Sequence, residues 1–254
     1  MSFQMFTPHL KLDLSAHRRV LAVTDVHGEH EKLVEALEGI GFEERLDALI
    51  INGDLVDRGP ASEAVVQWLE RPGIYRCVGN HDILAQCYLD GDLSADLIAE
   101  HGGGWFLTLA PERQTELARQ LSRGPLALTV TTPAGRNVGF AHADCWRDWR
   151  KHIAALKDPT AALHIEAKRL NLWSRNTITD LLEAAHKAKG KPVAYTCQVS
   201  GIDHVFHGHS TVTRPFAHNN RTWFDTAACY PGGYLTVLDV DAWLDRIDEH
   251  RPFQ

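Results

Sequence analysis

Three apolar runs in the first third of the chain each end in a group of polar residues, and this repeated order limits the fold most strongly. The runs cover residues 19–24, 47–51 and 74–78. Short apolar runs are typical of buried strands, and apolar residues at helical spacing in 33–40 and 64–69 predict intervening helices. Strands joined in this way run parallel. Their carboxyl ends then lie at one edge of a sheet, where α/β proteins bind ligands.

The remaining patterns extend this α/β plan. Turn residues separate the last apolar stretches, which predicts a β-meander near the end of the chain. No repeat or Pro/Ser-rich linker interrupts the sequence, so we expect one domain over residues 1–254, with 1–18 as an N-terminal extension. The expected helical segments are 83–122 and 146–189, and the expected strands are 126–130, 137–141, 205–206, 213–217, 221–225 and 234–240.

Composition excludes several classes of protein. In a chain of 254 residues, 44% hydrophobic and 23% charged residues are ordinary for a soluble globular protein. A net charge of −7 disfavours nucleic-acid binding, and no apolar run is long enough to span a membrane. Residues 1–19 lack a secretory signal pattern, and the 5 scattered cysteines predict free thiols, so we expect a cytoplasmic protein. The sequence leaves the oligomeric state open.

The polar residues at the strand ends have the chemistry of metal ligands. Asp25 and His27 are two apart on extended backbone and therefore point to the same side. Alone, this pair is more typical of a surface turn. Carboxylate, amide and imidazole donors at the other strand ends complete a set that suits Mn, Fe or Zn. The candidate ligands are Asp25, His27, Asp54, Asn80, His142, His207 and His209.

For other polar or small residues we favour structural interpretations. Asp82, Asp144 and His204 are expected as helix caps or surface residues, and Cys145 as a packed thiol. The glycines 102–104 predict a flexible break more than a phosphate-binding loop, because no strand precedes them and no lysine follows.

The order and spacing of these residues resemble a known family. The matching segments are Asp25-x-His27, Gly53-Asp54-x-x-Asp57-Arg58-Gly59, Gly79-Asn80-His81-Asp82, His142 and Gly208-His209, which are similar to the five signature segments of the calcineurin-like metallophosphoesterases. Residues 102–106, 173–175 and 224–226 resemble landmarks of the serine/threonine protein phosphatases of bacteria and phage lambda. The likeness covers about residues 19–240. It implies a sandwich of two central mixed β-sheets flanked by helices.

The resemblance also implies a phosphoesterase with two divalent metal ions, manganese above all, with iron or zinc as alternatives. The implied ligands are Asp25, His27 and His209 for the first ion, Asn80, His142 and His207 for the second, and Asp54 as the bridge. A hydroxide that bridges the ions would attack the phosphorus of a phosphate monoester directly.

The same resemblance assigns roles to the residues around the ions. His81, oriented by Asp57, would donate a proton to the leaving oxygen. Arg58, Arg175 and Asn80 would bind the phosphate, a role for which the planar, permanently charged fork of arginine is well suited.

The substrate stays open between phosphoproteins and nucleotides. Protein phosphatases of the family have an arginine before Gly-Asn-His, and Val78 stands there in this chain. Diadenosine tetraphosphate hydrolases have an aliphatic residue at that position, so this activity is the alternative to hydrolysis of phosphoserine or phosphothreonine. The acidic charge disfavours a nuclease. The presence of His81 and of every ligand disfavours an inactive phosphate-binding scaffold.

Overall fold

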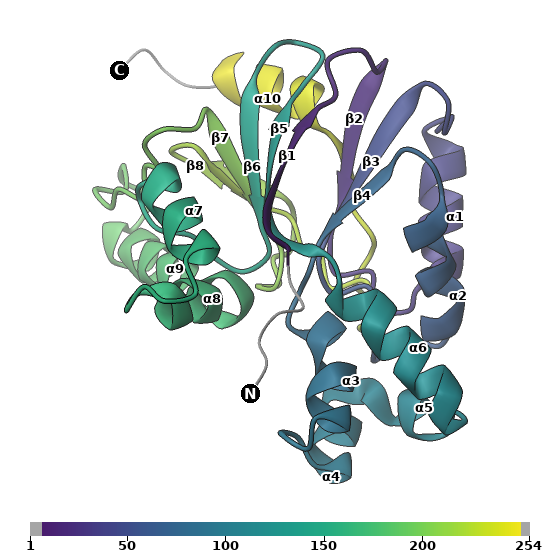
Figure 1. The fold of residues 1–254 in the computed structure, drawn as a ribbon. Coiled ribbons are helices and arrows are strands. Elements are labelled where there is room, and N and C mark those ends of the chain that lie inside the picture. The colour runs from purple at the N-terminus through teal and green to yellow at the C-terminus, as the bar shows by residue number, and fades with distance from the viewer. Residues whose placement is uncertain (1–6, 250–254) are drawn as a thin grey trace.

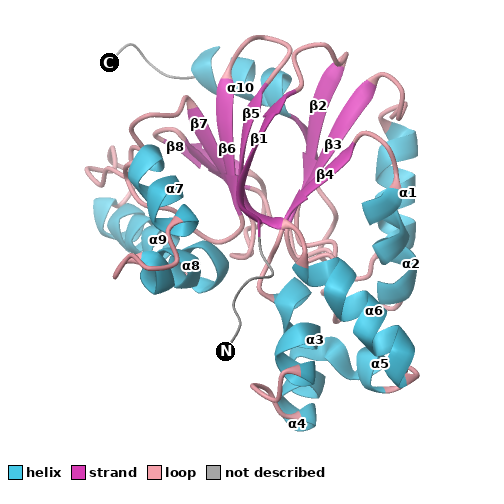
Figure 2. Ribbon diagram, viewed as in Figure 1, coloured by secondary structure: helices cyan, strands magenta, loops and turns pink. Residues whose placement is uncertain are grey.

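The computed structural model describes residues 7–249 and contains two mixed β-sheets that face each other. Helices cover the outer side of each sheet, and a separate group of helices extends from the edge of the sandwich (Figure 1, Figure 2). The predicted class, an α/β sandwich of two central sheets flanked by helices, is confirmed.

The four-stranded sheet is built from the apolar runs at the start of the chain. The strands β2 (Arg19–Val23), β3 (Asp47–Asn52) and β4 (Ile74–Cys77) run parallel, and β10 (Val237–Asp239) pairs antiparallel with β2. The helices α1 (His30–Gly39), α2 (Ser62–Val66) and η1 (Gln67–Glu70) connect the parallel strands. Strand residues alternate between faces, so Leu21 and Val23 join the core beneath these helices.

The six-stranded sheet has the strand order β1-β5-β6-β7-β9-β8. Its strands are β1 (Thr7–Asp13), β5 (Pro125–Thr131), β6 (Asn137–Ala141), β7 (His204–His207), β8 (Phe216–His218) and β9 (Arg221–Trp223). The helices α7 (Trp149–Lys157), α8 (His164–Trp173) and α9 (Asn176–Ala188) lie on its outer side (Figure 1). Trp149 and Leu156 of α7 pack in one core with Leu126 and Val205 of the sheet.

A helical segment joins the two sheets. It consists of α3 (His81–Leu89), α4 (Ala95–Ile98), the π-helix η2 (Ala99–Gly103), α5 (Gly104–Leu107) and α6 (Pro111–Ser122). The helix α3 begins directly after Asn80, so the end of β4 delivers both Asn80 and His81 to the same edge of the sheet.

The central core lies between the two sheets. Val20 and Ile50 from one sheet pack in the same core as Phe140 and Phe206 from the other. The rings of these two phenylalanines stack with their centroids 5.2 Å apart. The last helix, α10 (Val240–Glu249), adds Trp243 to this core. Among residues 7–249, no helix combines the length and the apolar character needed to cross a membrane.

Two sequence predictions about the ends of the chain are wrong in part. Residues 7–13, expected to belong to an extension, form β1, which pairs with β5 in the larger sheet. Residues 234–240 were expected as the last strand of a meander. They do not pair with the hairpin of β8 and β9 but contain β10, which belongs to the other sheet. Both errors concern which distant strand is the pairing partner.

Candidate active site

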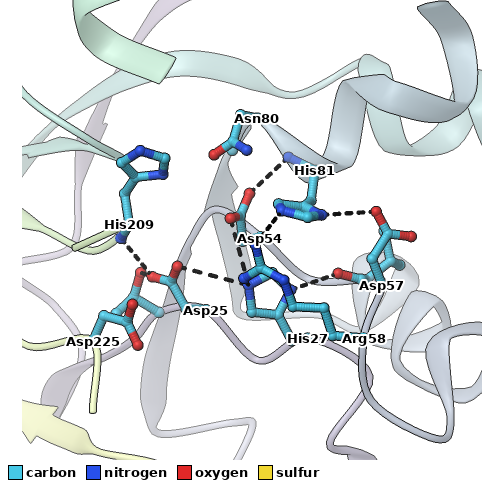
Figure 3. Close-up of polar contacts among 12 residues, drawn as sticks. Asp25, His27, Asp54, Asp57, Arg58, Asn80, His81, His209 and Asp225 are labelled. Atoms are coloured by element: carbon cyan, nitrogen blue, oxygen red, sulfur yellow. Dashed lines mark hydrogen bonds and ion pairs between the residues drawn. The ribbon is translucent and has the colours of Figure 1, made fainter. Parts of the chain in front are cut away.

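The polar residues that follow the strands meet at the carboxyl edge of the two sheets, as predicted. Figure 3 shows Asp54 in the middle of this group, with His27, His81 and Asn80 around it. The backbone there is unusual, because many of these residues adopt positive φ, a conformation that persists only where the surroundings hold it. The residues are Asp25, His27, Asp54, Asp57, Arg58, His209 and Ala227.

Asp54 belongs to two groups of candidate metal ligands. The first group is His27, Asp54 and His81, and the second is Asp54, His142 and His209; in each group the ligand atoms lie within 4.8 Å of one another. Asp54 Oδ2 is 3.6 Å from His27 Nε2 and 3.4 Å from His142 Nε2. One carboxylate therefore lies between two sets of imidazoles, which is the arrangement that bridging of two ions requires.

Hydrogen bonds to the backbone orient the imidazoles. His27 Nδ1 donates to Val56 O, and His142 Nδ1 donates to Asn52 O, both at 2.8 Å. This tautomer leaves Nε2 of each ring to face Asp54. His209 is turned the other way, because its Nε2 donates to Trp173 O at 3.2 Å and Nδ1 remains for a ligand. Such bonds fix the ring and the nitrogen that can bind a metal.

Asp25 and Asn80 flank these rings on opposite sides. Asp25 Oδ2 accepts the backbone N–H of His209 at 2.9 Å, and Oδ1 is 4.0 Å from His27 Nε2. Asn80 Oδ1 lies 3.1 Å from His142 Nε2. Asp25 is thus on the side of His27, and Asn80 is on the side of His142.

His207 lies outside both groups of candidate ligands in the part of the chain that the structure describes. Its Nδ1 donates to Ala141 O at 2.9 Å, and its Nε2 accepts from Arg221 at 3.2 Å. Arg221 is buried and also bonded to Asp144, so this lone pair is not free for a metal. The grouping therefore differs from the ligand assignment based on sequence, since His209 lies with His142.

The charges at the site favour a cation. Burial alone would lower the pKa of His142, but the neighbouring Asp54 carboxylate raises that pKa to about 10. Despite its own burial, Asp54 has a pKa held well below the usual range by His142, then by His81. Burial lowers the pKa of His27 and of His209 to about 3, so both rings are neutral ligands at neutral pH. These oxygen and nitrogen donors fit divalent metal ions.

His81, Asp57 and Arg58 lie next to the first group. His81 Nδ1 donates to Asp57 Oδ2 at 2.9 Å, as the family resemblance implied. Arg58 donates to His27 Nε2 at 2.6 Å and to His81 Nε2 at 2.8 Å. Unlike Arg221, Arg58 is exposed, so its guanidinium can leave these rings for another acceptor such as a phosphate oxygen. Arg175 lies on the other side, donating to His209 O at 2.8 Å.

The segment around the glycines 102–104 holds Asp57 and Arg58 in place. The interpretation of this segment as a flexible break did not predict that role. Trp105 Nε1 donates to Asp57 Oδ1 at 2.8 Å, on the oxygen that His81 does not use. The backbone N–H of Arg58 donates to Gly102 O at 3.1 Å. A Cβ at Gly102 would lie only 2.6 Å from Arg58 N, so only glycine allows this approach.

Three residues interpreted from the sequence as caps or surface residues are buried. The Asp82 carboxylate accepts the backbone N–H groups of Asp54, Leu55 and Gly79, and so connects the ends of β3 and β4. His204 donates or accepts at Thr222 Oγ1, 2.8 Å away. Asp144 pairs with Arg221 at 2.8 Å. Apart from Gly79, each partner is at least 18 residues away in the sequence, which is why local patterns did not predict burial.

Replacing Arg221 with methionine is expected to destabilise the fold by about 3–5 kcal/mol, because it leaves the buried Asp144 carboxylate without its partner. Arg221 also donates to Cys197 O at 2.8 Å and to Cys145 O at 3.0 Å. Urea unfolding measures the loss, and the same substitution at the exposed Arg45 is the matched control. A change below about 1 kcal/mol at Arg221 would contradict this role.

Comparison with known proteins agrees with this site. Residues 18–212 match the family model described as calcineurin-like phosphoesterase. The serine/threonine-protein phosphatase 1 of Salmonella typhimurium is 28% identical over 91% of this chain and 95% of its own length. The symmetrical bis(5'-nucleosyl)-tetraphosphatase of Serratia proteamaculans is 36% identical over 87% of this chain and 69% of its own length. A solved structure of a proposed diadenosine tetraphosphatase has a TM-score of 0.56 at 21% identity, covers 91% of this chain and 97% of its own, and shows the shared fold.

Proposed function

Because the chain belongs to the calcineurin-like phosphoesterase family and is a metal-dependent phosphoric ester hydrolase, we propose that it removes phosphate from phosphoserine and phosphothreonine in proteins. The observation that carries this proposal is the position of Asp54 between two groups of ligands, with the His81–Asp57 pair beside them. We take residues 1–254 to act as one domain.

The proposed ligands follow the contacts of the side chains. Asp25, His27 and Asp54 would hold one ion, and Asp54, Asn80, His142 and His209 the other. His207 is left out because Arg221 occupies its Nε2. The mixed oxygen and nitrogen donors, without cysteine, suit manganese best among the candidates, with iron or zinc as alternatives. When bound, such a pair of ions lowers the pKa of water and neutralises the charge on phosphoryl oxygens.

The residues around the ligands supply binding and proton transfer. Arg58 and Arg175 would bind phosphate oxygens from two sides, and Asn80 would add its amide N–H. His81 would donate a proton to the leaving oxygen, a step that contributes about 10²- to 10⁴-fold to the rate. Asp57, which accepts from Trp105, would keep His81 in position, and Gly102 O would hold the backbone of Arg58.

A dinucleoside polyphosphate is the second candidate substrate, and Val78 favours it. This residue is fully buried among Leu126 and Ala141, so no cation stands where protein phosphatases of the family have arginine. The relative from Serratia proteamaculans carries a tetraphosphatase name. The serine/threonine-protein phosphatase relative from Salmonella matches a larger share of its own length, which favours the first candidate.

A substrate panel on protein reconstituted with manganese separates the two candidates. We expect kcat/KM for a phosphoserine or phosphothreonine peptide to exceed that for diadenosine tetraphosphate by at least about tenfold, a difference of roughly 1.4 kcal/mol in transition-state binding. Preference for the dinucleotide would overturn the protein phosphatase proposal. Turnover on neither substrate would overturn both.

A further inference from the structure

The two proposed metal positions differ in the number of their protein ligands, and this difference points to a residue beyond the proposed set. On the side of His142, four side chains offer donors, namely Asp54, Asn80, His142 and His209. On the side of His27, Asp54 and Asp25 join the ring, and the remaining candidate donor there, His81, is bonded to Asp57 and Arg58. First-row divalent ions take at least four ligands in protein sites, so the second side has room for another donor.

Asp225 lies on that side. It follows β9 at the carboxyl edge of the sheet, and Figure 3 shows its carboxylate next to Asp25 and His209. Both carboxylates are buried and lie near enough to each other to repel.

The carboxylate of Asp225 is held in place but only partly satisfied. The side chain is 4% exposed, and its Oδ1 accepts the backbone N–H of Ala227 at 2.9 Å. That turn requires φ of 60° at Ala227, so the backbone is strained to hold Asp225 in this position. Within residues 7–249, no hydrogen-bond donor reaches the second oxygen, Oδ2. Two neighbouring carboxylates in a buried site repel each other, and a cation bound between them would relieve that repulsion.

We propose that Asp225 contributes a third carboxylate to the metal centre, next to Asp25, for the ion on the His27 side. This inference rests on the proposed function, because it assumes that two ions share Asp54. Asp225 belongs to the landmark segment 224–226, and it follows a strand in the same way as Asp25 and Asp54.

The test is a manganese titration of metal-free protein, in which metal content is measured at defined free manganese. For Asp225→Asn, we expect one of the two ions to bind about 10- to 100-fold more weakly, the range seen when groups that support a metal site are removed. Asparagine keeps the acceptor for the Ala227 N–H, so the turn is retained. Asp225→Ser, which also keeps a hydroxyl acceptor there, serves if the asparagine variant does not fold.

The matched control is Asp180→Asn, which removes an exposed carboxylate of α9 and should bind both ions as tightly as wild type. Wild-type affinities for both ions in the Asp225 variants would overturn the inference and leave the proposed function intact. A wild-type protein that binds no manganese would instead overturn the proposed function, and the inference with it.

Discussion

Asp54→Asn is expected to lose both metal ions at manganese concentrations that saturate wild type, and to lower kcat/KM by about 10³-fold or more. Asp54 is the one side chain common to the two ligand groups, and it faces His27 and His142 at 3.6 and 3.4 Å. An amide oxygen has no charge, and its nitrogen cannot bind the second ion. The metal ions supply several kcal/mol of transition-state stabilisation, and each 1.4 kcal/mol is about tenfold in rate.

Metal content and turnover should be measured on the same preparation of this variant. The Asp54 carboxylate also accepts the backbone N–H of His81 at 2.8 Å, a bond that the asparagine side-chain oxygen can retain. Loss of metal should therefore occur without loss of the fold, which circular dichroism checks. The exposed Asp92→Asn is the control and should match wild type. Equal metal content in wild type and Asp54→Asn would contradict a shared ligand.

His81→Asn is expected to give the opposite combination, with both ions retained and kcat lower by about 10²- to 10⁴-fold. His81 Nδ1 is bonded to Asp57, and His81 Nε2 faces Arg58. We therefore expect His81 to act as the proton donor and not as a metal ligand. The loss should be smaller for an aryl phosphate such as p-nitrophenyl phosphate than for phosphoserine, because a phenolate with a low pKa leaves without help from an acid.

The comparison between these two substrates separates a proton donor from a residue that only supports the site. A supporting residue would lower kcat equally for both, and that result would contradict the assignment. His186→Asn, at an exposed position on α9, is the matched control and should leave both rates unchanged. Loss of metal from His81→Asn would place His81 among the ligands, as its presence in the first group of candidate donors allows.

Local sequence patterns predicted those parts of the site that depend on neighbouring residues. The strand ends after Val23, Asn52 and Cys77 deliver Asp25, Asp54 and Asn80 to one edge, since parallel strands have their carboxyl ends together. The hydrogen bond between Asp57 and His81 was implied by the family resemblance, not by these local patterns.

The parts that were missed depend on contacts between residues far apart in the chain. Nothing near Thr7 indicates that residues 7–13 pair with β5, because strand partners are chosen by the whole fold. Trp105 belongs to the segment 102–106, whose sequence contains no sign that the Trp105 N–H reaches Asp57. The lone pair of His207 is used by Arg221, a residue that no local pattern connects with it.

The most direct test of the account is anomalous diffraction from crystals of the protein loaded with manganese. The account predicts two manganese peaks per chain, both bound to the carboxylate of Asp54, with His27 next to one and His142 next to the other. A single peak, or two peaks of which one is not bound to Asp54, would contradict it.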